Sequence, residues 1–230
     1  MPSGPEGAWW RLVRWGFHLL YNQLAFTYDA VSKVVSLGVW RCWQRSALKH
    51  IAPPADCPRV LEVAHGTGDL QIDLLRAGYH TIGYDLSPSM GRIARRKLRR
   101  QGLTPLLARG RAQALPFPAE HFDAVVATFP SEFITDPRTL LEIWRVLGAG
   151  CPLVIVPGAL FTAHGLPQRV LDWLYRITGQ RETGAEADAR LRDTLALIER
   201  HGFDVTSHWE DCPGSKVMVI SARKRSGFTD

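Results

Sequence analysis

Apolar and polar positions follow two periods along this chain, and the changes of period mark its expected elements. Short apolar runs of the kind that form buried strands recur at 60–64, 81–84, 106–108, 122–127 and 152–156. Between them lie longer stretches with helical spacing, such as 137–147. Strands that alternate with helices predict an α/β fold with a doubly wound, mostly parallel sheet.

The last third of the chain departs from this alternation. Residues 166–178 predict an inserted helix, and residues 187–201 a final crossover helix that ends at Gly202. Residues 203–210 and 216–222 then predict two strands joined by a tight turn, which pairs them antiparallel. The expected sheet therefore has seven strands and closes with a C-terminal antiparallel hairpin.

The N-terminal region has a different pattern. Residues 8–26 form an apolar run interrupted by Arg11, Arg14, His18 and Asn22, which draw one narrow polar stripe along a helix. These charges argue against a transmembrane span. The helix either caps the active site or lies in a membrane interface, where tryptophan and arginine are common.

A second helix is expected over 40–51, because Pro53 and Pro54 cannot continue it. The length of 230 residues suits one α/β domain with some decoration. We therefore predict a helical cap or lid at 1–55 and a cofactor-binding domain at 56–230.

The number and spacing of the cysteines bear on the cellular compartment and on metal binding. The four cysteines are scattered, without a CxxC pair or a His/Cys cluster at zinc spacing. We therefore expect neither a disulfide framework nor a metal site, and a reducing cytosol fits best. No stretch has the pattern of a cleavable signal peptide. The expected location is cytoplasmic, peripheral at the membrane if the first helix lies in the interface.

The charge raises the question of anionic partners. The net charge is +6, and much of the excess lies at 92–100. That segment is either the solvated face of an amphipathic helix or a contact for phosphate or headgroups. No RNA-binding module is visible in the sequence. The sequence therefore argues against nucleic acid and leaves the oligomeric state open.

A glycine-rich loop follows the first strand and precedes a helix, as in nucleotide-binding folds. The loop contains Gly66 and Gly68 but not the third glycine that a dinucleotide site has. Glu62 lies inside the strand before the loop, and Asp85 ends the second strand. Asp85 stands about 20 residues past the loop, where a carboxylate receives ribose hydroxyls. The segment 112–117 suits an adenine edge. These elements together predict S-adenosylmethionine (SAM), with S-adenosylhomocysteine as product.

Two further motifs narrow the prediction. Residues 25–29 read AFTYD, and residues 36–45 read SLGVWRCWQR, ahead of a loop with Ala64 in place of a first glycine. This set resembles the N-terminal signature and cofactor loop of the ubiquinone/menaquinone C-methyltransferase family. The resemblance implies a class I, Rossmann-like methyltransferase in which Tyr28 lies over the cofactor and helps to close the site.

The sequence and the resemblance together give the following expected cofactor-binding residues: Tyr28, Glu62, Ala64, His65, Gly66, Gly68, Asp85, Leu86, Met90, Arg111, Ala112, Gln113, Thr128 and Phe129. Arg111 departs from relatives that carry an acid there.

The catalytic hypothesis rests on the end of the fourth strand. Glu132 stands where the family has an arginine, and we nominate it as a general base, with Tyr28 as a positioning group. Surface charge is the alternative for Glu132, and His65 and His164 are weaker candidates. The expected acceptor is a small molecule, apolar or aromatic, resembling a quinone precursor or lipid. A soluble metabolite and a non-catalytic SAM-binding scaffold remain the alternatives.

Overall fold

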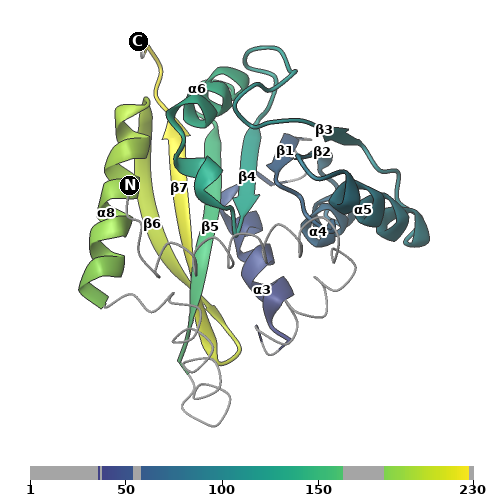
Figure 1. Ribbon diagram of the computed structural model, residues 1–230, viewed down its shortest axis with the longest axis horizontal. Helices are drawn as coiled ribbons and strands as arrows, with labels where there is room; N and C mark the ends of the chain where they lie inside the picture. The colour runs from purple at the N-terminus through teal and green to yellow at the C-terminus, as the bar shows by residue number, and fades with distance from the viewer. Residues whose placement is uncertain (1–35, 37, 54–57, 163–183, 228–230) are drawn as a thin grey trace, which may run out of the picture.

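The computed structural model of the chain describes residue 36 and residues 38–53, 58–162 and 184–227 (Figure 1). The predicted helices at 8–26 and 166–178, and the candidates Tyr28 and His164, lie outside the described residues.

Seven strands form one sheet in the order β3-β2-β1-β4-β5-β7-β6 (Figure 1). All neighbours pair in parallel except β7, which runs antiparallel to both β5 and β6. This arrangement confirms the predicted fold. The strands are β1 Arg59–Val63, β2 His80–Asp85, β3 Leu107–Arg109, β4 Ala124–Thr128, β5 Pro152–Phe161, β6 Phe203–Cys212 and β7 Ser215–Lys224.

The helices begin where the sequence supplies caps. Ser87 caps α5 by accepting a hydrogen bond from the Met90 N–H at 3.3 Å, and Asp136 caps α6 through the Arg138 N–H at 3.0 Å. The helices are α3 Trp40–Arg45, η2 Ser46–His50, α4 Asp69–Arg76, α5 Pro88–Arg100, η4 Glu132–Thr135, α6 Pro137–Val146 and α8 Gly184–Arg200. No helix in the described ranges is both long and apolar enough to cross a membrane.

The two faces of the sheet bury separate apolar clusters. Leu61 and Val125 point to the face covered by α6 and α8, whereas their neighbours Val60 and Val126 point to the face covered by α3, η2 and α4. This alternation places successive side chains on opposite faces. The described part of residues 1–55 thus shares a core with the sheet, and the division at residue 55 stays a prediction.

Strand β5 is longer than the sequence indicates. The sequence predicts this strand over 152–156, and the strong breakers Pro157 and Gly158 follow directly. It continues instead to Phe161, because β7 pairs along it past a register shift between Ile155 and Gly158. A bulge accommodates a proline that a regular ladder would reject.

The expectation that the cysteines stay unpaired is wrong for one pair. Cys42 of α3 and Cys212 at the end of β6 form a disulfide, with their Cα atoms 6.0 Å apart. They are 170 residues apart in sequence, so spacing gives no sign of their proximity. The argument from cysteine spacing for a reducing compartment therefore no longer holds. Cys151 is a free thiol.

Candidate functional site

A glycine-rich loop follows β1 and turns toward β2. Ala64, Gly66 and Gly68 all have positive φ, at 59°, 54° and 83°. The Ala64 N–H donates to the carbonyl of Tyr84 on β2 at 2.7 Å. A residue with a Cβ costs roughly 1 kcal/mol in this conformation, so the neighbouring strand holds Ala64 there. The loop backbone thereby reaches the carboxyl edge of the sheet.

Asp85, at the end of β2, joins this loop to α5. Its Oδ2 accepts the Gly66 N–H at 2.9 Å, and its Oδ1 accepts the Ser87 N–H at 2.7 Å. Each carboxylate oxygen has a second acceptor position. Asp85 lines the main cleft, so it can fix the loop and still receive hydroxyl groups of a ligand.

Glu62 lies one layer behind the loop and is buried. Its Oε2 accepts a hydrogen bond from Gln71 Nε2 at 2.7 Å, and the same amide donates to Thr81 Oγ1 at 3.0 Å. Burial raises the pKa of Glu62 to about 8, despite the opposing effect of the Gln71 hydrogen bond. Glu62 is not among the residues that line the cleft, so its place is that of a group ordering β1, β2 and α4.

His65 and Gly68 also shape the loop from behind. The buried His65 ring lies with Nδ1 2.9 Å from the Gly66 carbonyl, and burial lowers its pKa, so a neutral ring donates to that oxygen. Gly68 is the N-cap of α4, and a Cβ there would lie 2.9 Å from the Cβ of Ala94 on α5. A side chain at this position would push α5 away from the loop.

The main cleft has a volume of about 540 Å³ and opens at the carboxyl edge of the sheet. Its walls come from β1, β2 and β4, where the strand order reverses, the usual ligand position in such sheets. Ten of the predicted cofactor residues line it: Ala64, Gly66, Asp85, Leu86, Met90, Arg111, Ala112, Gln113, Thr128 and Phe129. Glu62, His65 and Gly68 stand behind it. That these residues bind SAM stays a prediction.

The predicted adenine segment is held by α6. Arg145 donates to the carbonyls of Leu115 at 2.9 Å and Phe117 at 2.7 Å. Gly110, just ahead of the segment, passes so close to Tyr84 that a Cβ would lie 1.8 Å from the Tyr84 hydroxyl oxygen. These contacts fix the backbone that faces the cleft.

Several lining residues were not foreseen. They are Val63, Tyr84, Ser87, Pro88, Arg109, Gly110, Ser131 and Phe133. Ser87 and Pro88 could have been predicted from the sequence, because a serine–proline pair after a strand is typical of a helix start, and this helix starts at the cleft. Nothing in the sequence alone announces the contact between Gly110 and Tyr84.

An aromatic wall closes the other side of the cleft. Phe129, directly after β4, has a φ of 49° and donates its N–H to the Val156 carbonyl at 2.7 Å. Its ring stacks on Trp40 of α3 with 4.2 Å between centroids and lies 5.9 Å from Trp43. The wall therefore depends on how α3 docks.

Side-chain bonds fix α3 in that position. Trp43 Nε1 donates to Ser215 Oγ at 2.9 Å, and Arg45 pairs with the buried Asp73 at 2.8 Å. The Cys42–Cys212 disulfide adds a covalent link.

The structure does not place Glu132 in the cleft lining, and its role as a base stays a prediction. Its side chain is exposed at the start of η4, whereas the flanking Ser131 and Phe133 line the cleft. A 3₁₀ turn sends neighbouring side chains in different directions, so position after β4 did not place this carboxylate in the cleft. Among the described lining residues, Asp85 is the only carboxylate.

Relatives share much of this chain. It is 36% identical over 156 residues to the demethylmenaquinone methyltransferase of Thermus thermophilus, covering 66% of this chain and 70% of that protein. It is 32% identical over 143 residues to the ubiquinone/menaquinone biosynthesis C-methyltransferase of Pectobacterium carotovorum, covering 60% of this chain and 57% of that one. The chain thus spans less than two thirds of the length of the second relative.

The fold is shared more widely. A SAM-dependent methyltransferase of Thermotoga maritima, described as a possible histamine N-methyltransferase, superposes with a TM-score of 0.58 at 21% identity, covering 90% of this chain and 99% of that one. At that identity the likeness concerns the fold alone. Residues 15–180 match the ubiE/COQ5 methyltransferase family. With its class I fold and its cleft at the strand reversal, the chain belongs to the ubiE/COQ5 family of SAM-dependent methyltransferases.

Proposed function

We propose that this chain transfers the methyl group of SAM to a ring carbon of an apolar aromatic acceptor of the quinone-precursor kind. The observation that carries the proposal is the ring of Phe129, which lines the cleft directly after Thr128 and is backed by Trp40, with 4.2 Å between the ring centroids. A flat ring packs well against such a wall. The name of the Thermus relative points to demethylmenaquinone as the acceptor to test.

When bound, SAM supplies an activated methyl group, and the protein contributes alignment and exclusion of water. Asp85 and the loop it holds orient one end of the cleft. Phe129, held in place by the Trp40 ring stacked on it, orients the plane of the acceptor at the other end. Bound SAM would supply its methyl group to an electron-rich ring carbon and leave as S-adenosylhomocysteine, and the displaced ring proton would be released to solvent.

The cofactor part of the proposal is tested by calorimetric titration with SAM. Asp85→Ala removes the acceptor of two backbone N–H groups and of ligand hydroxyls, so we expect the Kd to rise about 100-fold. Asp85→Asn, which keeps an acceptor oxygen, is the matched variant and should lose less. Unchanged affinity in Asp85→Ala would place the cofactor elsewhere.

The acceptor part needs a panel of substrates. Reduced demethylmenaquinone and a small soluble catechol are each incubated with isotopically labelled SAM, and the products are identified by mass spectrometry. We expect methylation of the apolar ring. Methylation of the catechol alone would assign the chain to soluble metabolites. Tight SAM binding without methylation of any acceptor would favour the scaffold alternative.

A further inference from the structure

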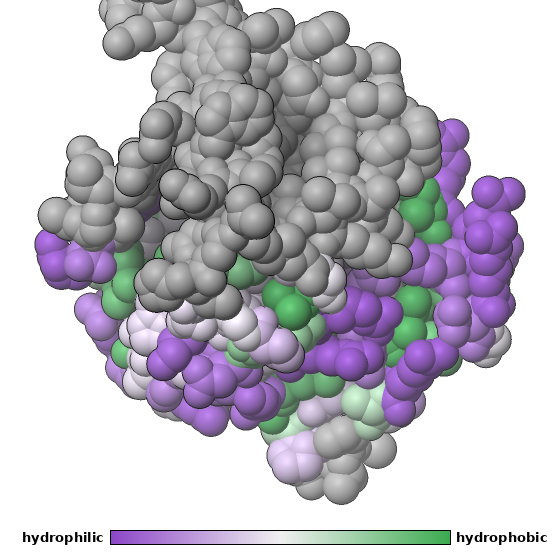
Figure 2. Space-filling model, turned by 90° about the horizontal axis from the view of Figure 1, so that it is seen from below, coloured by the Kyte–Doolittle hydropathy of each residue, from purple (hydrophilic) through white to green (hydrophobic). Residues whose placement is uncertain are grey.

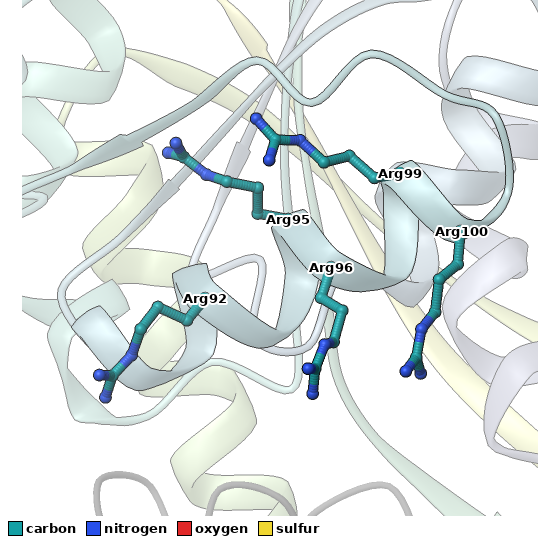
Figure 3. Close-up of a pocket in the computed structure, with 5 residues that line it drawn as sticks. All are labelled: Arg92, Arg95, Arg96, Arg99 and Arg100. Carbon is teal, nitrogen blue, oxygen red and sulfur yellow. The ribbon is translucent and has the colours of Figure 1, made fainter.

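Helix α5 carries an unusual concentration of positive charge on its outer surface. Its exposed basic residues are Arg92, Arg95, Arg96, Arg99 and Arg100. Figure 3 shows their side chains leaving the helix in two rows, with Arg92, Arg96 and Arg100 on one side and Arg95 and Arg99 on the other. We call these five residues the arginine face.

No carboxylate in the described part of the chain pairs with the arginine face. The α5 sequence contains no acidic residue. Within the described residues, no ion pair joins any of the five guanidinium groups to a carboxylate, and Arg92 contacts only the neutral Ser89 hydroxyl at 3.0 Å. The sixth basic residue differs, because Lys97 turns inward and pairs with Asp69 at 3.1 Å.

The shape of the arginine face suits an extended partner. The five side chains border a shallow hollow of about 460 Å³. At 1.5 Å of rise per residue, the Cα atoms of Arg92 and Arg100 lie about 12 Å apart. That distance is too wide for one phosphate and suits several anionic groups side by side.

The composition around α5 favours lipid over nucleic acid. The helix has no aromatic side chain on which a base could stack. Leu106, in the segment after α5, is strongly exposed at 54%, and Leu86, exposed at 58% just before α5, also lines the main cleft. Figure 1 places α5 on the right-hand side of the molecule. On that side, Figure 2 shows a largely hydrophilic surface in which some hydrophobic residues are interspersed. Basic groups beside exposed apolar side chains are typical of membrane-surface contacts.

We infer that the arginine face docks on a membrane surface rich in anionic phospholipid headgroups. This goes beyond the proposed function, since the contact needs neither SAM nor an acceptor. The start of α5 also lines the main cleft, through Pro88 and Met90. Docking there holds the cleft near the bilayer, where an apolar acceptor dissolves; only this benefit rests on the proposed function.

The test is flotation of the full chain with vesicles of phosphatidylcholine that contain about 30% phosphatidylglycerol, a strongly anionic surface. Each basic residue near such a surface strengthens binding about fivefold. The variant Arg96→Gln/Arg99→Gln/Arg100→Gln should therefore bind about 100-fold more weakly. These three residues do not line the cleft, so SAM titration should be unchanged and will show that the variant is folded.

A matched variant carries the same change of charge elsewhere. Arg192, Arg200 and Arg223 are exposed on α8 and β7, toward the opposite end of the sheet. Their triple change to glutamine should weaken vesicle binding by no more than about threefold, the remainder of a non-specific charge effect. Any contribution of residues 1–35 is common to all variants, so the difference between the two triples isolates α5.

Four results would overturn the inference. The two triple variants could lose affinity equally, which would make net charge the cause. The chain could bind pure phosphatidylcholine as tightly as the anionic vesicles. Inorganic phosphate at about 10 mM, too dilute to act by screening, could displace it, which would indicate a site for a free anion. The chain could also bind a double-stranded oligonucleotide more tightly than it binds the vesicles, which would make nucleic acid the partner.

Discussion

The two ends of the cleft are built in different ways. The end where we expect the cofactor comes largely from one continuous stretch, Glu62 to Met90, whose groups hydrogen-bond to each other, and residues 110–113 complete it. The acceptor end combines Trp40 of α3 with Phe129 after β4, which are 89 positions apart in the sequence. Its geometry is set by attachments of α3 to distant strands.

This difference predicts that the two ends respond separately to mutation. Changes to the attachments of α3 should alter stability and acceptor use, and leave SAM affinity alone. Changes behind the loop should act on the cofactor end.

The largest effect is expected from breaking the disulfide. Cys42→Ser releases a link that closes a loop of about 170 residues, so the free energy of unfolding in non-reducing buffer should fall by about 4 kcal/mol. Denaturant unfolding measures this, with Cys151→Ser as the matched change at a free thiol. Equal unfolding midpoints for the oxidised wild type and Cys42→Ser would show that the link adds no stability.

The next effect concerns Glu62 and pH. Its pKa is raised to about 8 in the fold from a usual 4.5. The folded state therefore binds this proton more tightly than the unfolded state. The stability from this group is complete below pH 4.5 and is lost as the pH rises toward 8.

Glu62→Gln lacks this titration. The free energy of unfolding of the variant should therefore rise relative to that of the wild type between pH 5 and pH 8, by about 3 kcal/mol. Chemical denaturation at several pH values measures the trend. Glu199→Gln, an exposed change on α8, serves as control. If the difference in unfolding free energy between Glu62→Gln and the wild type does not change with pH, Glu62 is ionised over the whole range from pH 5 to pH 8.

A smaller effect is expected at the aromatic wall. Trp40→Leu keeps an apolar side chain and removes the stack on Phe129. We expect kcat/KM for the apolar acceptor to fall about 10-fold, or about 1.4 kcal/mol, with the SAM Kd unchanged. Trp209→Leu, at an exposed position of β6, is the control. A change in SAM affinity alone would contradict the separation of the two ends.

The smallest effect is expected at Glu132. Because its carboxylate lies outside the cleft lining, Glu132→Gln should change kcat by less than about threefold. A loss of several hundredfold, with stability and SAM binding intact, would restore Glu132 as the base and show that η4 rearranges during turnover.

The sequence predicted what local patterns control. Four of the five apolar runs became buried strands of the parallel region because burial on both faces demands continuous apolar residues, and the run at 106–108 became the edge strand β3. The position of Asp85 in the cleft could be predicted because a strand end next to a glycine-rich turn allows few backbone conformations. Pro157 misled the prediction because the bulge that accommodates it depends on pairing with β7. Cys42 and Cys212 misled it for the same reason, since their proximity arises only in the assembled fold.

Helix α5 touches both the cofactor loop and the surface of the molecule. On its inner side, Lys97 Nζ lies 3.2 Å from Thr67 Oγ1 and 3.1 Å from Asp69 Oδ1, within the loop and the first turn of α4. Any ligand that shifts α5 from outside therefore acts on the loop where we expect SAM to bind. Thermodynamic linkage requires that this influence be reciprocal. If vesicles change the affinity for SAM by some factor, SAM must change the affinity for vesicles by the same factor.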